Sequence, residues 1–340
     1  MQKRLDNGTF GYSIVPEEWN EAYRNWWGRR HGFWMEKDWL IFCTGVVPAI
    51  SSIVRKLTTP NENVLIQTPV YNIFFNSIIN NGCRVLESPL RYEDGVYAID
   101  FADLEEKLAD PQTTLMILCN PHNPVGKIWD RQTLAHIGEL CEKHHVTVIA
   151  DEIHCDLTKP GMEYIPFASV SETCKQISIP CIAPTKTFNL AGLQVSNIFI
   201  PNRTLRTAFR KQVDAAGYSQ LNAMGLTACE AAYTYGETWY QAMMEYVESN
   251  IAFVRDYLKK ELPQIKLIEP EGTYLLWLDF RALGMTEKER EDLIVNQAKL
   301  WLDSGAIFGQ VGEGFERINV ACPRATIKEA LDRLKAVITA

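Results

Sequence analysis

The sequence predicts an α/β protein built on a largely parallel sheet. Short apolar runs rich in β-forming residues alternate with stretches of helical periodicity, the pattern typical of such folds. Several of these runs end in clusters of polar residues rather than in simple turns. The chain has 340 residues, 46% hydrophobic and 22% charged, which is an ordinary globular composition.

The first part of the chain supplies most of the expected sheet. A helix is expected over residues 131–145, where apolar side chains recur at helical spacing. A turn that contains glycine precedes another helix in TGVVPAISSIVRKL, which has proline near its first position. The predicted strands are residues 63–68, 113–121, 146–152, 177–188 and 195–201.

The pattern changes after about residue 245. A long helix over roughly 238–262 leads to paired strands that include residues 273–280. A charged helix at 286–303, a last strand at 316–323 and a terminal helix follow. We therefore expect a large domain of residues 40–245 and a smaller α/β domain formed by residues 1–39 with 246–340.

Charge and composition exclude several classes of function. The formal net charge is −8 and the sequence contains no run of lysine and arginine, so we expect neither nucleic acid nor a membrane as partner. The start lacks the apolar stretch of a signal peptide, and no apolar run approaches the length of a membrane span. The nine cysteines are scattered and never spaced as CxxC, which predicts reduced, buried thiols in a cytoplasmic protein.

Polar residues gather at four predicted turns beyond strand ends. In an α/β sheet, ligands bind beyond the carboxyl ends of the strands, so one sizeable polar ligand would contact all four. The segments are residues 44–48 (TGVVP), 120–126 (NPHNPVG), 151–154 (DEIH) and 185–186 (TK).

Lys186 and Asp151 are the strongest candidates for chemistry. Lys186 follows an apolar run, and a desolvated amine of lowered pKa is able to form an imine with an aldehyde. The alternative is a structural lysine paired with Asp151. Asp151 closes an apolar strand and would either cap the next helix or hold a pyridine nitrogen protonated.

The remaining candidates each have a structural alternative. Asn123 either caps its rigid turn or donates to a ring oxygen of the ligand. Val46 and Val47 begin a helix whose free N–H groups would bind phosphate, although many helices begin this way. Tyr71 is either a core aromatic or a ring stacked on the ligand. His154 lies three residues after Asp151, but no further ligand stands at metal spacing, so we expect no metal.

Taken together, these segments resemble the aminotransferase class I/II family of fold-type-I enzymes dependent on pyridoxal 5′-phosphate (PLP). They are most similar to its cystathionine β-lyase, or C–S lyase, branch. The resemblance implies a large domain with a mostly parallel seven-stranded sheet and a smaller C-terminal domain. The resembling segments run in the family's order over nearly the whole chain: GVVPAI, TPVYNIFF, NPHNPVGKIW, ADEIHCDL, APTKTFNLAGLQ, GTYLLWLDF and FERINVACPR.

The resemblance implies specific roles for the candidates. Lys186 would hold PLP as an imine and exchange the proton at the substrate Cα, and Asp151 would pair with the pyridinium. Tyr71 would stack on the ring, with Asn123 and His154 near its oxygen. Val46, Val47 and Thr185 would bind the phosphate.

Two further residues are implied to complete the site. Arg324, in CPR, would grip the substrate carboxylate in a bidentate fork. Tyr12, in FGY, would reach the phosphate of a partner subunit, so the site implies a homodimer.

The chain also departs from the family in two places. Gln194 stands where many aminotransferases of the family carry a phosphate-clamping arginine, which fits the lyase branch. Some fifty further N-terminal residues usually cover the active-site entrance in the family, whereas this sequence begins almost at FGY. A truncated start or an open site is therefore expected.

These implications predict αβ-elimination from an S-substituted cysteine such as cystathionine, which yields a thiol (homocysteine), pyruvate and ammonia. An aminotransferase is the alternative, because it shares every step up to loss of the Cα proton. A PLP-binding protein without catalysis is the alternative of another class, motivated by the short N-terminus.

Overall fold

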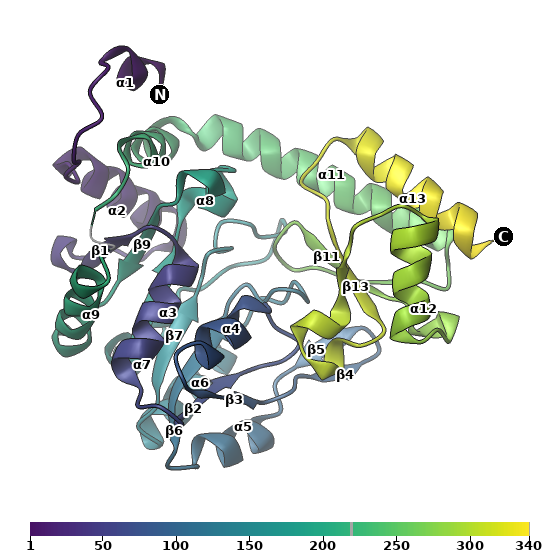
Figure 1. The fold of residues 1–340 in the computed structure, drawn as a ribbon, viewed down its shortest axis with the longest axis horizontal. Helices are drawn as coiled ribbons and strands as arrows, with labels where there is room; N and C mark the ends of the chain where they lie inside the picture. The colour runs from purple at the N-terminus through teal and green to yellow at the C-terminus, as the bar shows by residue number, and fades with distance from the viewer. Residues whose placement is uncertain (218–219, 340) are drawn as a thin grey trace.

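A computed structural model describes residues 1–217 and 220–339 of the chain (Figure 1). Over these residues the main sheet has seven strands in the order β1-β9-β8-β7-β6-β2-β3. Neighbouring strands from β3 to β8 run parallel, and β9 runs antiparallel to both β8 and β1. The strands are β1 (Leu40–Cys43), β2 (Asn63–Ile66), β3 (Arg84–Glu87), β6 (Thr113–Cys119), β7 (Thr147–Asp151), β8 (Ser178–Ile182) and β9 (Ser196–Phe199). The expected mostly parallel seven-stranded sheet is confirmed.

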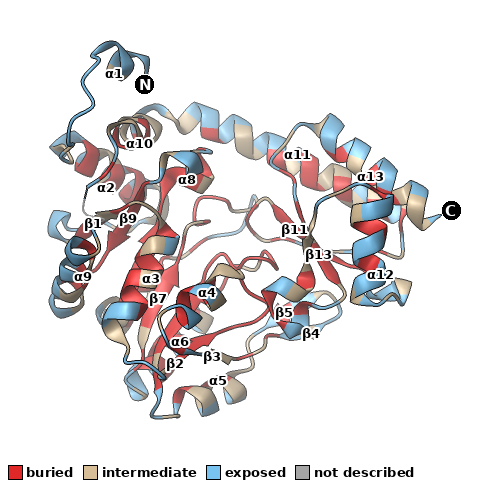
Figure 2. Cartoon of the chain, in the orientation of Figure 1, coloured by how far each residue is buried: buried red, intermediate tan, exposed pale blue. Residues whose placement is uncertain are grey.

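Helices cover both faces of this sheet, so its central strands are buried on each side (Figure 2). Apolar side chains of α3 (Val46–Leu57), α4 (Ile73–Ile79) and α9 (Arg203–Ala215) pack in one cluster with alternate residues of the strands. The other residues of the same strands pack against α5 (Phe101–Leu108), α6 (Arg131–Lys143) and α7 (Glu172–Ile177). Strands buried on both faces must be apolar throughout, which is why continuous apolar runs predicted them.

The C-terminal part forms a second unit in which one antiparallel sheet packs against helices. Its antiparallel sheet has the order β10-β11-β13-β12 among the described residues and packs against two helices in a separate apolar cluster. The elements are α11 (Glu237–Glu261), β10 (Lys266–Ile268), β11 (Leu275–Asp279), α12 (Glu287–Glu291), β12 (Asp303–Ser304), β13 (Phe315–Asn319) and α13 (Arg324–Ile338). A small two-stranded ribbon, β4 (Arg91–Glu93) with β5 (Val96–Ala98), lies outside both sheets.

The N-terminal region is held by aromatic packing. After α1 (Gln2–Asp6), helix α2 (Glu17–His31) buries Trp19, Trp26 and Trp27 in one cluster with residues of β9 and α10 (Ala223–Tyr235). The division into residues 40–245 and 1–39 with 246–340 stays a prediction. The packing of α2 favours placing residues 17–31 with the large domain.

Two expected elements differ from the structure. The charged helix over 286–303 is interrupted: α12 gives way to a π-helical stretch at Asp292–Gln297, and β12 follows. The strand expected over 177–188 ends at Ile182, and Lys186 lies on the short helix α8 (Pro184–Thr187). Pro184 at the first helical position lacks the N–H a strand would need, which explains the change.

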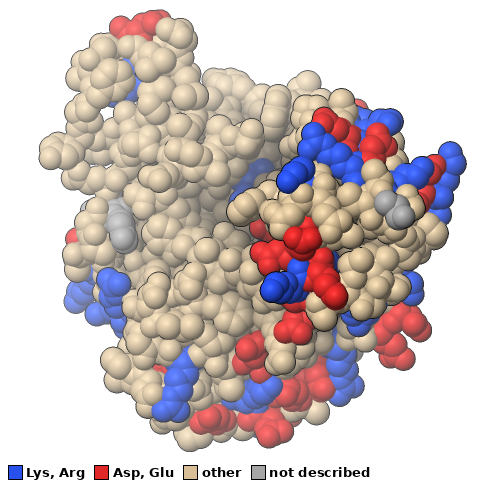
Figure 3. Space-filling model, turned by 45° about the vertical axis from the view of Figure 1, so that its right-hand side comes forward, with Lys and Arg blue, Asp and Glu red and all other residues tan. Residues whose placement is uncertain are grey.

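No helix among the described residues is long and apolar enough to cross a membrane. On the face shown in Figure 3, lysines and arginines are interspersed with acidic side chains, so this face carries no continuous basic surface.

Candidate active site

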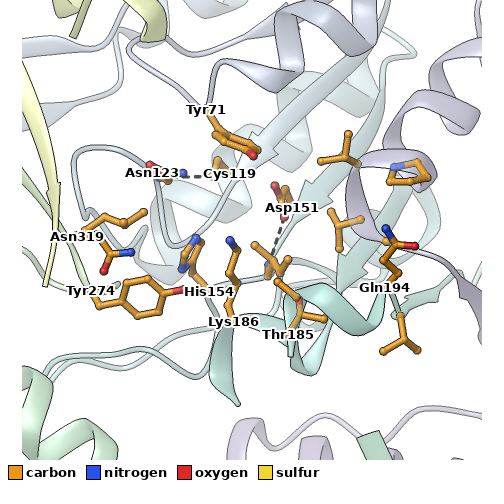
Figure 4. A pocket seen from close by; sticks show the side chains of 18 of the residues that line it. Tyr71, Cys119, Asn123, Asp151, His154, Thr185, Lys186, Gln194, Tyr274 and Asn319 are labelled. Carbon is orange, nitrogen blue, oxygen red and sulfur yellow. Dashed lines mark hydrogen bonds between the residues drawn. The ribbon is translucent and has the colours of Figure 1, made fainter. Parts of the chain in front are cut away.

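A cavity of about 440 Å³ opens beyond the carboxyl ends of the central strands. It is lined by residues of the four segments that the sequence singled out, together with residues of the C-terminal part (Figure 4). Eight of the ten predicted site residues line it: Val46, Val47, Tyr71, Asn123, Asp151, His154, Thr185 and Lys186. Tyr12 and Arg324 do not.

Lys186 projects from α8 toward the middle of the cavity, with His154 and Asp151 on either side in Figure 4. Its side chain is half-buried. Burial lowers the pKa of its ammonium, Asp151 opposes this shift, and nearby Arg317 adds to it. The amine is therefore more readily deprotonated than a surface lysine, as a nucleophile or base requires.

Asp151 ends β7 at the floor of the cavity and is 4% exposed. Its Oδ1 accepts a hydrogen bond from the Ile153 N–H at 3.3 Å, and no other described group donates to the carboxylate. Burial raises the pKa of Asp151 to about 7, although the Ile153 N–H and Lys186 both oppose the rise. A buried carboxylate with so few donors fits a ligand that brings its own cationic N–H.

Tyr71 lies across the cavity from Lys186 in Figure 4, where it contacts Phe74 edge to face at 5.8 Å between ring centroids. Burial raises the pKa of its hydroxyl, and Asp151 contributes to the rise. Its ring remains available to pack on a planar ligand.

His154 is held neutral. Burial lowers the pKa of the imidazole to about 3, and Lys186 and Arg317 contribute. Its Nδ1 is buried and has no partner among the described residues, so it is available to a polar atom of a ligand. Its ring meets Tyr274 edge to face at 5.9 Å.

The opposite end of the cavity offers neutral donors. Helix α3 has no side-chain cap at Gly45, which leaves the first N–H groups of a 12-residue helix free toward the cavity. Thr185 and Gln194 line the same cavity. A helix start of this kind binds phosphate through its N–H groups and its dipole. Together with Asp151, these features fit the expected cofactor, with its anionic phosphate and its pyridine nitrogen.

Arg317, which the sequence reasoning missed, is the arginine of the cavity. It lies on β13, and its guanidinium donates to Asn123 Oδ1 at 2.7 Å and to Asp303 Oδ2 at 2.7 Å. Arg317 and Asn319 are two residues apart on one strand, so both project to the same side, and both line the cavity. The alternation of side chains along this strand was the sequence signal that could have identified Arg317 as a cavity residue.

The structure does not bring Arg324, the residue expected to grip the substrate carboxylate, to this cavity. Arg324 begins α13 and turns away, so that its guanidinium donates to Asn250 Oδ1 at 2.6 Å and Ser249 Oγ at 2.8 Å and stacks over Phe253. The strand has already ended at Asn319, and the turn that follows carries Arg324 past the cavity.

Tyr12 is 94% exposed on an N-terminal segment that extends from the body of the molecule (Figure 1). It lies outside the cavity of its own chain. Its proposed contact with a partner subunit stays a prediction.

Comparison with known proteins identifies the family. The pattern described as "Aminotransferase class I and II" matches residues 3–334. The chain is 43% identical to cystathionine beta-lyase PatB of Bacillus subtilis (strain 168), over 100% of this chain and 88% of that protein. It is 30% identical to protein MalY of Escherichia coli (strain K12), over 100% of this chain and 87% of that protein.

Solved structures agree. A PLP-bound putative aminotransferase from Clostridium difficile 630 matches with a TM-score of 0.97 and 42% identity, over 99% of this chain and 87% of that one. Cystalysin from Treponema denticola, which contains PLP, matches with a TM-score of 0.97 and 39% identity, over 99% and 86% of the two chains. A PLP-bound C–S lyase from Staphylococcus hominis matches with a TM-score of 0.93 and 33% identity, over 100% and 86%. The chain belongs to the PLP-dependent aminotransferase class I and II family, with the fold-type-I architecture.

Proposed function

We propose that the chain is a PLP-dependent C–S lyase that cleaves S-substituted cysteines by αβ-elimination. Water and the substrate RS–CH₂–CH(NH₃⁺)–COO⁻ give the thiol RSH, pyruvate and ammonium. The geometry that supports this proposal is a desolvated lysine, a buried carboxylate and an arginine around one cavity. The similarity to proteins named cystathionine beta-lyase and C–S lyase supports the choice of reaction.

PLP, when bound, supplies an aldehyde that condenses with amines and a ring that withdraws electrons from the substrate Cα. Lys186 holds the cofactor before the substrate arrives. Its freed amine then takes the proton from Cα, for which its lowered pKa suits it. The C–H bond breaks first, and the Cβ–S bond then breaks to release the thiolate.

Asp151 would hold a proton at the pyridine nitrogen, and the resulting ion pair would stabilise the buried charge of the carboxylate. Tyr71 would pack on one face of the ring, and Asn123 and His154 would supply polar contacts to the ring oxygen. The free N–H groups of Val46 and Val47, with Thr185, would bind the phosphate.

We propose that Arg317, rather than Arg324, binds the substrate carboxylate. A guanidinium forms two parallel hydrogen bonds with a carboxylate, which fixes the direction of the Cα–H bond. Asn123 and Asp303 already orient Arg317 at the cavity wall.

A homodimer with shared sites follows if Tyr12 reaches the phosphate of the partner subunit. Its 94% exposure in one subunit supports an intermolecular role. A cytoplasmic location and the absence of nucleic-acid partners remain predictions.

The reaction type is tested by product analysis of purified protein loaded with PLP. Cystathionine or S-methylcysteine should yield pyruvate, ammonium and thiol in equal amounts.

An aminotransferase is the second candidate, favoured by the 42% identity to a putative aminotransferase. Transfer of the amino group to an added 2-oxo acid, without release of ammonium or thiol, would establish that alternative.

Two arginine variants test which residue, Arg317 or Arg324, binds the substrate carboxylate. We expect Arg317→Ala to lower kcat/KM by about a hundredfold or more, since a desolvated charge pair is worth about 2–5 kcal/mol. Arg324→Ala is the matched control, and steady-state kinetics should find its kcat/KM within about threefold of the unaltered enzyme. A larger loss in Arg324→Ala than in Arg317→Ala would contradict the assignment.

Asp151 also predicts a pH dependence of stability in the cofactor-free protein. Its folded pKa of about 7 lies above the unfolded value of 3.8, so the folded state binds more protons between these values. The contribution of Asp151 to the free energy of unfolding therefore falls as the pH rises through this interval. Asp151→Asn should be more stable than the unaltered protein at about pH 8, by at most about 4 kcal/mol.

The advantage of Asp151→Asn should shrink to about 0.5 kcal/mol near about pH 4 and vanish below about pH 3, where the carboxyl is neutral in both the folded and the unfolded state. Urea unfolding at several pH values measures it. Adding PLP should reverse the order, because only the carboxylate gains an ion pair from the cofactor. The same stability of both proteins at every pH, with and without PLP, would rule out this role.

A further inference from the structure

A second cavity of about 430 Å³ adjoins the catalytic one. The two cavities share Lys186, Tyr274 and Asn319 in their linings. The second cavity therefore borders Lys186, the residue whose amine would face the substrate Cα, and its lining includes none of the residues at the proposed phosphate end. Its volume lies within the range of small-molecule sites.

One face of α11 forms the wall of this second cavity. Trp239, Met243, Tyr246 and Val247 are spaced by four, three and one residues, which places them on the same side of the helix. Val247 is buried in the core, whereas Trp239 is 49% and Tyr246 is 47% exposed. The apolar stripe of α11 thus continues beyond the core and into an open cavity.

The wall is pre-formed rather than loose. The hydroxyl of Tyr246 accepts a hydrogen bond from the Arg324 N–H at 2.8 Å. The indole of Trp239 lies 6.0 Å from the ring of Phe188, which follows the α8 helix that carries Lys186. Side chains held in this way lose little freedom when a ligand arrives.

The charge of the lining distinguishes between substituents. Among the described residues that line the second cavity, Lys186 is the one residue with a formally charged side chain, and its amine is needed for proton transfer at the substrate Cα. The distal amino and carboxylate groups of cystathionine would find no oppositely charged side chain there with which to form an ion pair. An alkyl or aryl group would instead be removed from water against Trp239, Met243 and Tyr246.

We infer that the second cavity binds the sulfur substituent of the substrate and selects apolar ones, such as S-benzyl, over the charged substituent of cystathionine. This inference rests on the proposed C–S lyase activity and names the substrate class within it. The substituent enters between Tyr274 and the α11 wall while Arg317 holds the carboxylate. Removal of apolar surface from water then favours the bulky thioether.

The test compares kcat/KM for S-benzylcysteine, S-methylcysteine and cystathionine in the PLP-loaded enzyme. The unaltered enzyme should prefer S-benzylcysteine to both of the others. Trp239→Arg should lower kcat/KM for S-benzylcysteine about tenfold, since a single apolar pocket contact discriminates by about 10- to 200-fold. It should leave S-methylcysteine within about twofold and raise cystathionine, whose distal carboxylate gains a cation.

Two controls accompany this variant. Trp239→Phe keeps an aromatic wall and should keep the preference. Trp301→Arg makes the same substitution at a tryptophan that is 90% exposed and lies outside the cavity, and it should change none of the three values.

Several outcomes would overturn the inference. One is an equal loss of activity on all three substrates in Trp239→Arg. A dissociated oligomer in light scattering, with that equal loss, would mean that a second copy of the chain covers this wall. Turnover of S-methylcysteine without any preference for S-benzylcysteine would remove the inference but leave the lyase intact. Failure to turn over any of the three would remove both.

Discussion

The structure depends on one carboxylate buried at the end of the central strand. Asp151 lies at the floor of a cavity with a single backbone donor, and burial raises its pKa to about 7 even though that donor and Lys186 both act to lower it. An isolated buried charge is costly, so this arrangement is unfavourable until a cation faces it. A pyridine nitrogen that carries a proton meets the requirement. In the proposed function, the carboxylate would in return keep the ring electron-poor, which is the property that the chemistry at Cα needs.

The fold explains how the other groups come to face Asp151. Parallel strands end at one edge of the sheet, and β6, β7 and β8 lead directly to Asn123, Asp151 and Lys186 in the cavity. The C-terminal sheet then closes the opposite side with Arg317 on β13. The main sheet thus supplies the residues proposed to hold the cofactor, whereas the C-terminal sheet supplies Arg317, the residue proposed to bind the substrate carboxylate.

Sequence patterns predicted the elements whose burial is uniform. The strands at β6 and β7 are apolar on both faces, so composition alone located them, and the polar residues beyond their ends marked the cavity. The same reasoning named Arg324 and missed Arg317, because the position of each side chain depends on where β13 ends and to which side each residue projects. It also placed Lys186 on a strand, since the apolar run continues to Pro184, which instead begins a helix. The aromatic packing of α2 was equally hidden, because several of its partners, including Phe199 and Tyr233, lie more than a hundred residues away in the sequence.

The central claim is that Lys186 carries the cofactor opposite Asp151. The visible absorption spectrum tests it most directly when PLP is titrated into purified protein and into Lys186→Ala, followed by borohydride reduction and peptide mass analysis. We expect an absorption band above about 400 nm at a stoichiometry of about one PLP per subunit, absent from Lys186→Ala, and a reduced pyridoxyl group on the peptide that contains residue 186. A band of equal intensity in Lys186→Ala, or the label on another lysine, would contradict it.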